Sequence, residues 1–448
     1  MVVQHNMQAM NANRMLNVTT SAQSKSTEKL SSGYRINRAA DDAAGLTISE
    51  KMRKQIRGLD QASTNAEDGV SSVQTAEGAL TEVHSMLQRM NELATQAANG
   101  TNSKDSDRQA IQDEIDQLTT EIDRVSETTK FNETYLLKGD KGATKNVFMN
   151  GHDAGLKGTL TDSAKSATFV MDELKAGDKV TIAGKEYSIG STDADIKTAL
   201  TKFATAGNEV TIDGNSYTYK DADGGKAAGW YKDGDQTNGT ALAPDTAIKV
   251  GTKASINGTD YTAMDENNGV DKDDSSIITA DKALDLIKGE LTAANNIGTV
   301  DHKATVEDPA TANGKTTFTI NKGYATVADT LSFNLHVGAD ADMTNKINVN
   351  IDSMDSASLG IKGLNIKDDS GNAATYAVDA ISDAISKVSS QRSSLGAVQN
   401  RLEHTINNLD NVVENTTTAE SRIRDTDMAS EMVNYSKNNI LAQAGQSM

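Results

Sequence analysis

Apolar residues recur every seven positions across residues 59–97, and this period restricts the fold more than any other feature of the chain. One series is Leu59, Ala66, Val73, Leu80, Leu87 and Ala94, and a second is Ala62, Gly69, Ala76, Val83, Met90 and Ala97. Two series offset by three and four residues form the apolar seam of a helix that supercoils against other helices. We predict one helix from about Thr47 to Ala98, roughly 75 Å long at 1.5 Å per residue.

A second helix is predicted directly after the first. Gly100 follows Asn99 and can adopt the left-handed conformation that ends many helices. Ser106 and Gln109 have the spacing of a capping box, which starts a new helix. Its apolar stripe is Ile111, Ile115, Leu118, Ile122 and Val125. Because the intervening loop is short, the two helices are expected to be antiparallel neighbours.

The C-terminal arm carries a matching seam. Its period-seven series is Ile381, Val388, Leu395, Leu402 and Leu409, with Ile385, Ile406 and Val413 beside it and Arg392 and Gln399 interrupting the second series. Burying each large seam residue contributes about 1.5–3 kcal/mol. We therefore expect both chain ends to form an antiparallel coiled-coil stalk. The seam is predicted to contain Leu59, Val73, Leu80, Leu87, Met90, Ile115, Leu118, Ile122, Val388, Leu395, Leu402 and Leu409.

The middle of the chain has a different character. Residues 1–130 and 377–448 contain one aromatic residue each, and the remaining aromatic residues lie between them. Three segments share the form G-x-x-(V/A)-(T/S)-I-x-G-x-x-Y-(S/T): GDKVTIAGKEYS (177–188), GNEVTIDGNSYT (207–218) and GTKASINGTDYT (251–262). Alternation around an x-Gly turn predicts β-hairpins. Helical patterns follow at 193–206 and 275–291, and strand patterns at 315–327, 331–340 and 346–352. The expected fold is α + β, with three small β-rich units inserted into a helical stalk.

Composition excludes several classes of protein. The chain has 448 residues, no cysteine and a formal net charge of -19. Disulfides and thiolate metal sites are therefore impossible, and binding to nucleic acid or to an anionic membrane is disfavoured. The chain has no apolar segment of the ~20 residues needed to span a bilayer, and its first thirty residues do not resemble a secretory signal. No cofactor is expected.

Catalytic and metal-binding motifs are also missing. The six histidines show no H-E-x-x-H pair, and the sequence lacks a G-x-S-x-G elbow and a phosphate-binding glycine loop. His84 and His404 are interpreted as tolerated stalk residues. The acidic run 220–239 could supply calcium ligands, but it lacks a full twelve-residue loop with a terminal glutamate, and a solvated surface loop is the preferred interpretation. A catalytic site built from scattered residues stays open as the weakest alternative.

Both arms closely resemble bacterial flagellin. The similar strings are LSSGYRINRAADDAAGLTISEKMRKQIRGLDQASTNAEDGVSSVQTAEGAL (30–80), LQRMNELATQAANGTNS, EIDRVSETTKFNETYLL (121–137), LGIKGLNI (359–366) and VSSQRSSLGAVQNRLEHTINNLDNVVENTTTAESRIRDTDMASEMVNYSKNNILAQAG (388–445). The resemblance implies an extracellular subunit that polymerises into the flagellar filament for motility and leaves the cell by flagellar type III export. It also implies several partners: further copies of the chain, an export chaperone, the hook-associated and cap proteins, and the host Toll-like receptor for flagellin.

The resemblance also implies a division of the chain. We expect filament-core segments at 1–46 and 426–448, stalk segments at 47–140 and 376–425, and variable β-rich domains at 141–375. The last core segment is expected to be incomplete, because the chain ends at Met448 before the apolar terminus usual in this family.

Two sets of site residues are carried over from the resemblance. Arg89, Leu93 and Glu114 match the patch that the Toll-like receptor recognises, with Gln88, Gln96 and Ile111 beside them. Leu93 is expected at the edge of the buried stripe. The chaperone site is expected in the C-terminal helix at Met428, Met432, Val433, Ile440 and Leu441. Catalytic and metal-binding residues are not expected.

Besides the catalytic alternative, two others remain open. A hook–filament junction protein shares the same helical ends, and a stalked adhesin could use the repeats to bind a ligand. The density of the match to flagellin in both arms argues against the junction protein.

Overall fold

The computed structural model describes residues 7–103, 106–237, 239–298 and 301–447. Its helices are α1 (Met7–Ser32), α2 (Ala43–Ala97), α3 (Asp107–Thr128), α4 (Asp193–Phe203), α5 (Pro244–Ala247), α6 (Ala280–Asn295), η1 (Met343–Asn345), α7 (Ser356–Leu359), α8 (Asn372–Arg424) and α9 (Met428–Ser447). Two compact units divide the chain. The first comprises Met1–Glu77, Ser332–Asn350 and Arg392–Met448, and the second comprises Gly78–Leu331 and Ile351–Gln391. Both α2 and α8 contribute to each unit.

The predicted coiled-coil stalk is present as antiparallel α2 and α8. In the first unit, the Ser49 hydroxyl donates to Glu420 (2.7 Å), the Ser63 hydroxyl to Asp410 (3.2 Å), and Arg392 pairs with Glu77 (3.6 Å). Residue numbers thus rise along α2 as they fall along α8. The predicted seam positions are buried, except that Leu118 is half-buried. The α2 helix starts at Ala43, before the expected Thr47, because the Asp42 carboxylate accepts the backbone N–H of Gly45 (2.9 Å).

The connection between α2 and α3 differs from the prediction in two ways. Gly100 does not adopt a left-handed conformation, and Ser106 makes no side-chain capping hydrogen bond. The Gln109 side chain instead donates to Asp113 (2.6 Å) and accepts from Lys367 (2.9 Å), so it is not free to complete a capping box. The end of α2 is held by another residue, described below.

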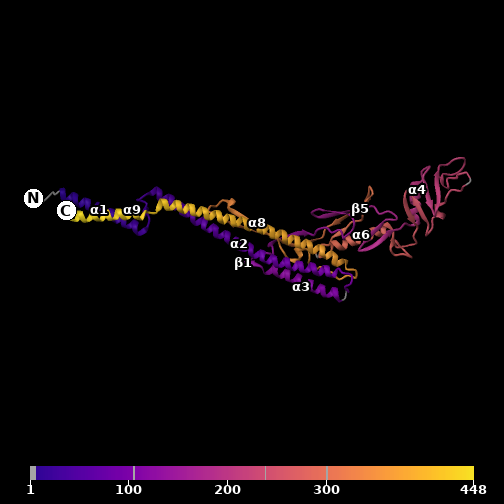
Figure 1. Ribbon diagram of the computed structural model, residues 1–448, viewed down its shortest axis with the longest axis horizontal. Helices are drawn as coiled ribbons and strands as arrows, with labels where there is room; N and C mark the ends of the chain where they lie inside the picture. Colours follow the sequence, from indigo (N-terminus) through magenta and orange to yellow (C-terminus); the bar gives the residue numbers. More distant parts are fainter. Residues whose placement is uncertain (1–6, 104–105, 238, 299–300, 448) are drawn as a thin grey trace. The chain divides into compact units, whose positions relative to one another are not determined.

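Helices α1 and α9 lie side by side in the first unit, coloured indigo and yellow in Figure 1. The turn after α1 is joined to the break between α8 and α9. Tyr34 forms a β-bridge with Asp425, the guanidinium of Arg35 donates to the carbonyl of Ile423 (2.6 Å), and the Arg424 guanidinium lies 4.6 Å from the centre of the Tyr34 ring.

The middle of the chain is rich in strands, as the sequence predicts. They are β1 (Lys130–Phe131), β2 (Thr134–Tyr135), β3 (Asp140–Phe148), β4 (Thr159–Asp162), β5 (Ser166–Asp172), β6 (Lys179–Ile182), β7 (Lys185–Ile189), β8 (Glu209–Ile212), β9 (Asn215–Lys220), β10 (Gly229–Lys232), β11 (Lys253–Ile256), β12 (Thr259–Thr262), β13 (Glu266–Asn267), β14 (Val270–Asp271), β15 (Ile277–Ile278), β16 (Thr305–Val306), β17 (Ala310–Ala312), β18 (Lys315–Asn321), β19 (Tyr324–Asp329), β20 (Leu331–His336) and β21 (Lys346–Ile351). The larger sheets have the strand orders β10-β9-β8-β11-β12, β13-β14-β15-β7-β6 and β16-β18-β5-β4, and β19-β3 and β20-β21 form two-stranded sheets.

Each of the three sequence repeats forms a hairpin with a two-residue turn. The turns are Ala183-Gly184, Asp213-Gly214 and Asn257-Gly258, and both residues of every turn have positive φ. This is the turn that matches the twist of paired strands. The prediction of three separate β-rich units is wrong, however. The second and third hairpins share one sheet because β8 pairs with β11, whereas the first hairpin joins β15 in another sheet.

Two hydrophobic cores stabilise these sheets. One contains Phe169, Phe318 and the buried face of α6, and the other contains Trp230 and the buried face of α4. In the first unit, the β20–β21 hairpin packs on the stalk, where Leu335 and Val337 meet Ala66 and Leu402.

Candidate interaction surfaces

The surface around Arg89 is formed by α2 and α3. Arg89 Nε lies 2.9 Å from Glu114 Oε1, and Nη1 lies 3.2 Å from Glu92 Oε2. The Arg89 side chain is 50% exposed and the Glu114 side chain 45% exposed. The hydrogen bond to Glu114, followed by that to Glu92, raises the pKa of Arg89 above its ordinary value. The guanidinium is thus held by two carboxylates while part of it stays open to solvent.

The other residues expected at this surface fall into two groups. Gln88 and Gln96 are exposed beside Arg89. Leu93 and Ile111 are buried, with exposures of 2% and 7%. Leu93 is therefore not at the edge of the buried stripe, because α3 and the segment before α8 both pack at this end of α2.

Arg108 joins α2, α3 and the segment before α8, a role that its sequence pattern does not indicate. Its side chain is 1% exposed. Nε donates to the carbonyl of Ala97 (2.9 Å), Nη1 to that of Asp368 (2.7 Å) and Nη2 to that of Asn99 (3.4 Å). The guanidinium thereby satisfies carbonyls at the C-terminus of α2, which have no partners within the helix, and links α2 to the segment before α8.

The Asp368 carboxylate fixes the backbone of that segment by accepting hydrogen bonds from its N–H groups. Partial burial raises the pKa of its carboxyl, but hydrogen bonds from the Ser370 hydroxyl and from the backbone N–H groups of Ala373, Gly371 and Asn372 outweigh it, and the pKa is lowered. A carboxylate at this position satisfies N–H groups at the start of α8 and interacts favourably with the helix dipole. Arg108 and Asp368 are thus structural residues beneath the Arg89 surface.

Exposed apolar side chains define a second surface on α1 and α9. On α1 they are Met7, Met10, Met15 and Val18, with exposures of 57–74%. On α9 they are Met428, Met432, Val433, Ile440 and Leu441, with exposures of 49–68%. A groove of about 840 Å³ runs between the two helices and is lined by Met15, Leu16, Leu441 and Gly445, among others. Clusters of exposed apolar side chains are typical of protein–protein interfaces.

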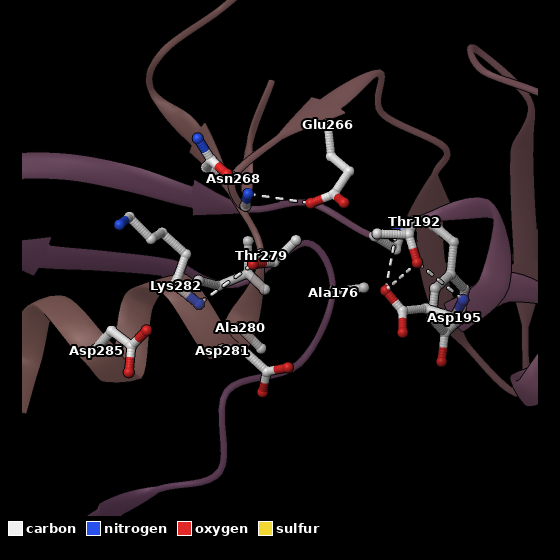
Figure 2. Close-up of a pocket in the computed structure, with 15 residues that line it drawn as sticks. Ala176, Thr192, Asp195, Glu266, Asn268, Thr279, Ala280, Asp281, Lys282 and Asp285 are labelled. Carbon is white, nitrogen blue, oxygen red and sulfur yellow. Dashed lines mark hydrogen bonds between the residues drawn. The ribbon is translucent and has the colours of Figure 1, made fainter. Parts of the chain in front are cut away.

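A third feature is a cleft of about 620 Å³ lined by the end of β7, the start of α4 and the start of α6. Figure 2 shows the carboxylates of Asp195, Glu266, Asp281 and Asp285 around it. Asp195 accepts the Thr192 N–H and hydroxyl (both 2.8 Å), and Glu266 accepts the Gly269 N–H (3.0 Å). These two carboxylates therefore support local turns.

No group of three or more His, Cys, Asp or Glu side chains within the described ranges could hold a metal ion. The acidic run 220–239 accordingly supplies no such group from its described residues.

Comparison with known proteins decides the family. The families described as "Bacterial flagellin N-terminal helical region" and "Bacterial flagellin C-terminal helical region" match residues 3–142 and 378–448. A flagellin of Clostridium tyrobutyricum is 39% identical, with 100% of this chain and 98% of the relative covered. The chain belongs to the flagellin family. The flagellin of Bacillus subtilis (strain 168) is 34% identical, with 100% of this chain and 95% of the relative covered. Among solved structures, FliC from Burkholderia pseudomallei is similar at 20% identity and a TM-score of 0.27, with 74% of this chain and 99% of that chain covered.

This flagellin is a structural subunit of the flagellar filament, and it is not an enzyme. It is located outside the cell, where copies of the chain polymerise with one another. Identity to flagellins along the whole chain favours a filament subunit over a hook–filament junction protein or a stalked adhesin. Within the part of the chain that the structure describes, every helix is too short or too polar to cross a membrane.

Proposed function

We propose that α1 and α9 make the contacts that hold subunits together in the filament, as parts of core segments 1–46 and 426–448. The support is the set of exposed apolar side chains on both helices, which the single chain leaves in water. Burying apolar area between copies supplies about 25 cal/mol per Å², so a repeated contact of this kind favours polymerisation. The remaining segments, 47–140, 141–375 and 376–425, would then form the stalk and the variable domains.

A charge placed on this surface should block assembly. Val433→Asp puts a carboxylate on a side chain that is 68% exposed in the monomer, so the monomer should keep its helical content. Asn434→Asp adds the same charge at the adjacent, exposed position and is the matched control. We expect short filament seeds to be extended by the control and not by Val433→Asp, as seen by electron microscopy. Equal extension by both variants would contradict the proposal.

We further propose that the export chaperone covers the α9 part of this surface before secretion. Met428, Met432, Val433, Ile440 and Leu441 are flexible or branched apolar side chains on one helix, which suits binding in an apolar groove. The chaperone should therefore compete with seed extension, and Val433→Asp should weaken its binding as well. The hook-associated and cap proteins would contact subunits at the filament ends through α1 and α9.

The surface around Arg89 is proposed as the site for the host Toll-like receptor for flagellin. Gln88, Arg89, Gln96 and Glu114 would contact the receptor, while the buried side chains of Leu93 and Ile111 support them from below. An arginine held in place by carboxylates offers a fork of donors and a flat face at little cost in conformational entropy. Arginine is frequent among residues that dominate binding energy.

The proposal can be tested with two variants and one control. Arg89→Ala and Glu114→Ala should each weaken receptor binding severalfold while leaving helical content unchanged. Arg124→Ala is the control, because Arg124 is also an exposed arginine on this helical pair and forms an ion pair with Glu121. Affinity unchanged in both test variants would reject the site.

A further inference from the structure

Methionine is the only sulfur-containing residue of this chain, because the sequence has no cysteine. With no thiol to compete, the methionine thioether is the group that a mild two-electron oxidant attacks, and attack requires access to the sulfur. Within the described residues, six methionines are exposed, and five of these lie on α1 and α9: Met7, Met10, Met15, Met428 and Met432. The sixth is Met343, which lies between β20 and β21 and is 73% exposed.

The other methionines of the described part of the chain are less accessible. The buried ones are Met90, Met149, Met171, Met264 and Met354, and Met52 and Met86 have intermediate exposure. The accessible sulfur atoms are thus concentrated on the two helices that carry the proposed contacts between subunits.

The five methionines of α1 and α9 are spread along this helical pair. Met428 and Met432 lie in the first turns of α9, after the β-bridge that joins the end of α8 to the turn after α1. Met10 lines a hollow of about 560 Å³ on α1, and Met15 lines the groove of about 840 Å³ between the two helices. A polar atom added to any of these side chains would therefore lie within the exposed apolar surface.

Oxidation makes exactly this kind of change to a methionine side chain. When hydrogen peroxide is the oxidant, a sulfur lone pair attacks one peroxide oxygen, and the S–O bond forms as the O–O bond breaks. The departing hydroxide takes the proton from the transferred oxygen and leaves as water, so the sulfur loses the two electrons that the peroxide gains. The resulting sulfoxide is polar and accepts hydrogen bonds, and burying it without a donor is unfavourable.

We propose that Met7, Met10, Met15, Met428 and Met432 form a reversible oxidation site that controls assembly. Hydrogen peroxide converts them to sulfoxides in the free subunit, and the oxidised subunit no longer extends the filament. Methionine sulfoxide reductases, one for each epimer, restore the subunit by using two electrons and two protons from a dithiol, with the oxygen released as water. This inference rests on the proposed role of α1 and α9 in assembly.

A partition experiment tests the oxidation site without any substitution. Full-length monomer is partially oxidised with hydrogen peroxide, the peroxide is removed with catalase, and seeds of untreated protein are added. Mass spectrometry of peptides then compares the sulfoxide content of each methionine in the filaments and in the unassembled remainder. We expect a severalfold excess in the remainder at the α1 and α9 positions, and equal content in both fractions at Met343. Equal content at the α1 and α9 positions, or an excess at Met343 as large as theirs, would overturn the proposal.

Leucine substitutions remove the oxidisable atoms and keep the surface apolar. The combined variant carries Met7→Leu, Met10→Leu, Met15→Leu, Met428→Leu and Met432→Leu, and it should extend seeds equally well before and after peroxide treatment. The matched control, Met343→Leu, should lose extension as the parent protein does, and both reductases together should restore it. A combined variant that peroxide inactivates as strongly as the parent would overturn the proposal. If this variant does not assemble before oxidation, the partition experiment decides.

Peroxide treatment of finished filaments separates this inference from the proposed role of α1 and α9. If the two helices hold subunits together, their methionines should oxidise severalfold more slowly in filaments than in monomers, while buried Met90 should oxidise slowly in both. Equal rates in filaments and monomers would reject the role of α1 and α9 in assembly. Slower oxidation in filaments, combined with normal extension by fully oxidised monomers, would reject only the control of assembly by oxidation.

Discussion

Replacing Arg108 should destabilise the region where the end of α2 meets the segment before α8. The guanidinium is almost completely buried and donates to three backbone carbonyls. A hydrogen bond from a charged donor contributes about 1.5–3 kcal/mol, and the two shorter bonds, to Ala97 and Asp368, are the strong ones. Arg108→Ala removes both hydrogen bonds and leaves their acceptors without this donor, so we expect the local stability of the junction to fall by about 3–5 kcal/mol. Arg108→Met keeps most of the side-chain volume and isolates the loss of the hydrogen bonds.

The loss can be measured locally by hydrogen exchange of the amides at the end of α2 and the start of α8. A change of 3 kcal/mol corresponds to about two orders of magnitude in protection. Arg124→Ala is the control, because the Arg124 side chain is 60% exposed and pairs with Glu121 on the same helix. Such an exposed ion pair contributes little to stability. Protection in Arg108→Met that stays within threefold of the parent protein would refute the role assigned to Arg108.

Two further predictions follow from close packing and from charge. In α2, a Cβ at Gly58 would lie 2.9 Å from the Ala339 Cβ, whereas a Cβ at Gly78 would meet nothing within 4 Å. Gly58→Ala should therefore destabilise the contact with the β20–β21 hairpin by about 1–3 kcal/mol, and Gly78→Ala should stabilise the helix by about 0.5–1 kcal/mol. A denaturation midpoint for Gly58→Ala that equals or exceeds that of Gly78→Ala would contradict this reasoning. Burial raises the pKa of Asp352, but hydrogen bonds from Lys145 and Thr330 outweigh it and lower the pKa below its ordinary value. Because its pKa is lowered, this carboxylate stabilises the fold at pH values above the ordinary carboxyl pKa of about 4, and the stabilisation is lost as the pH falls below that value. Lys145→Met should therefore reduce the loss of stability on acidification below about pH 4.

The stalk could be predicted because one physical requirement determines it. A long helix that buries one stripe must place apolar residues every three and four positions, and the pattern from Leu59 to Ala97 records that requirement directly. The hairpins were predictable for a similar local reason, since an x-Gly pair supplies the two positive φ values that a tight turn needs.

The pairing of the hairpins was not predictable from the same information. Ile182, Ile212 and Ile256 occupy equivalent places in the three repeats, so each hairpin presents nearly the same apolar face. The choice among them depends on which helix covers which face, and that choice follows from chain connections and from the strands between repeats. Arg108 was missed because a charged residue between polar neighbours has the appearance of a surface position. Leu93 was misplaced because two elements, rather than one, cover that end of α2.

The contrast between Leu93 and the apolar residues of α9 shows what separates intrachain packing from assembly in this protein. Both are apolar residues on long helices, and composition does not distinguish them. Leu93 lies where α3 and the segment before α8 converge on α2, so the single chain covers it almost completely. Among the described residues, α9 makes its main contacts with α1, which covers one side of the helix, so Met432, Val433 and Ile440 remain exposed. These side chains can be buried only against another molecule, and because this protein polymerises, we expect a further copy of the chain to cover them in the filament.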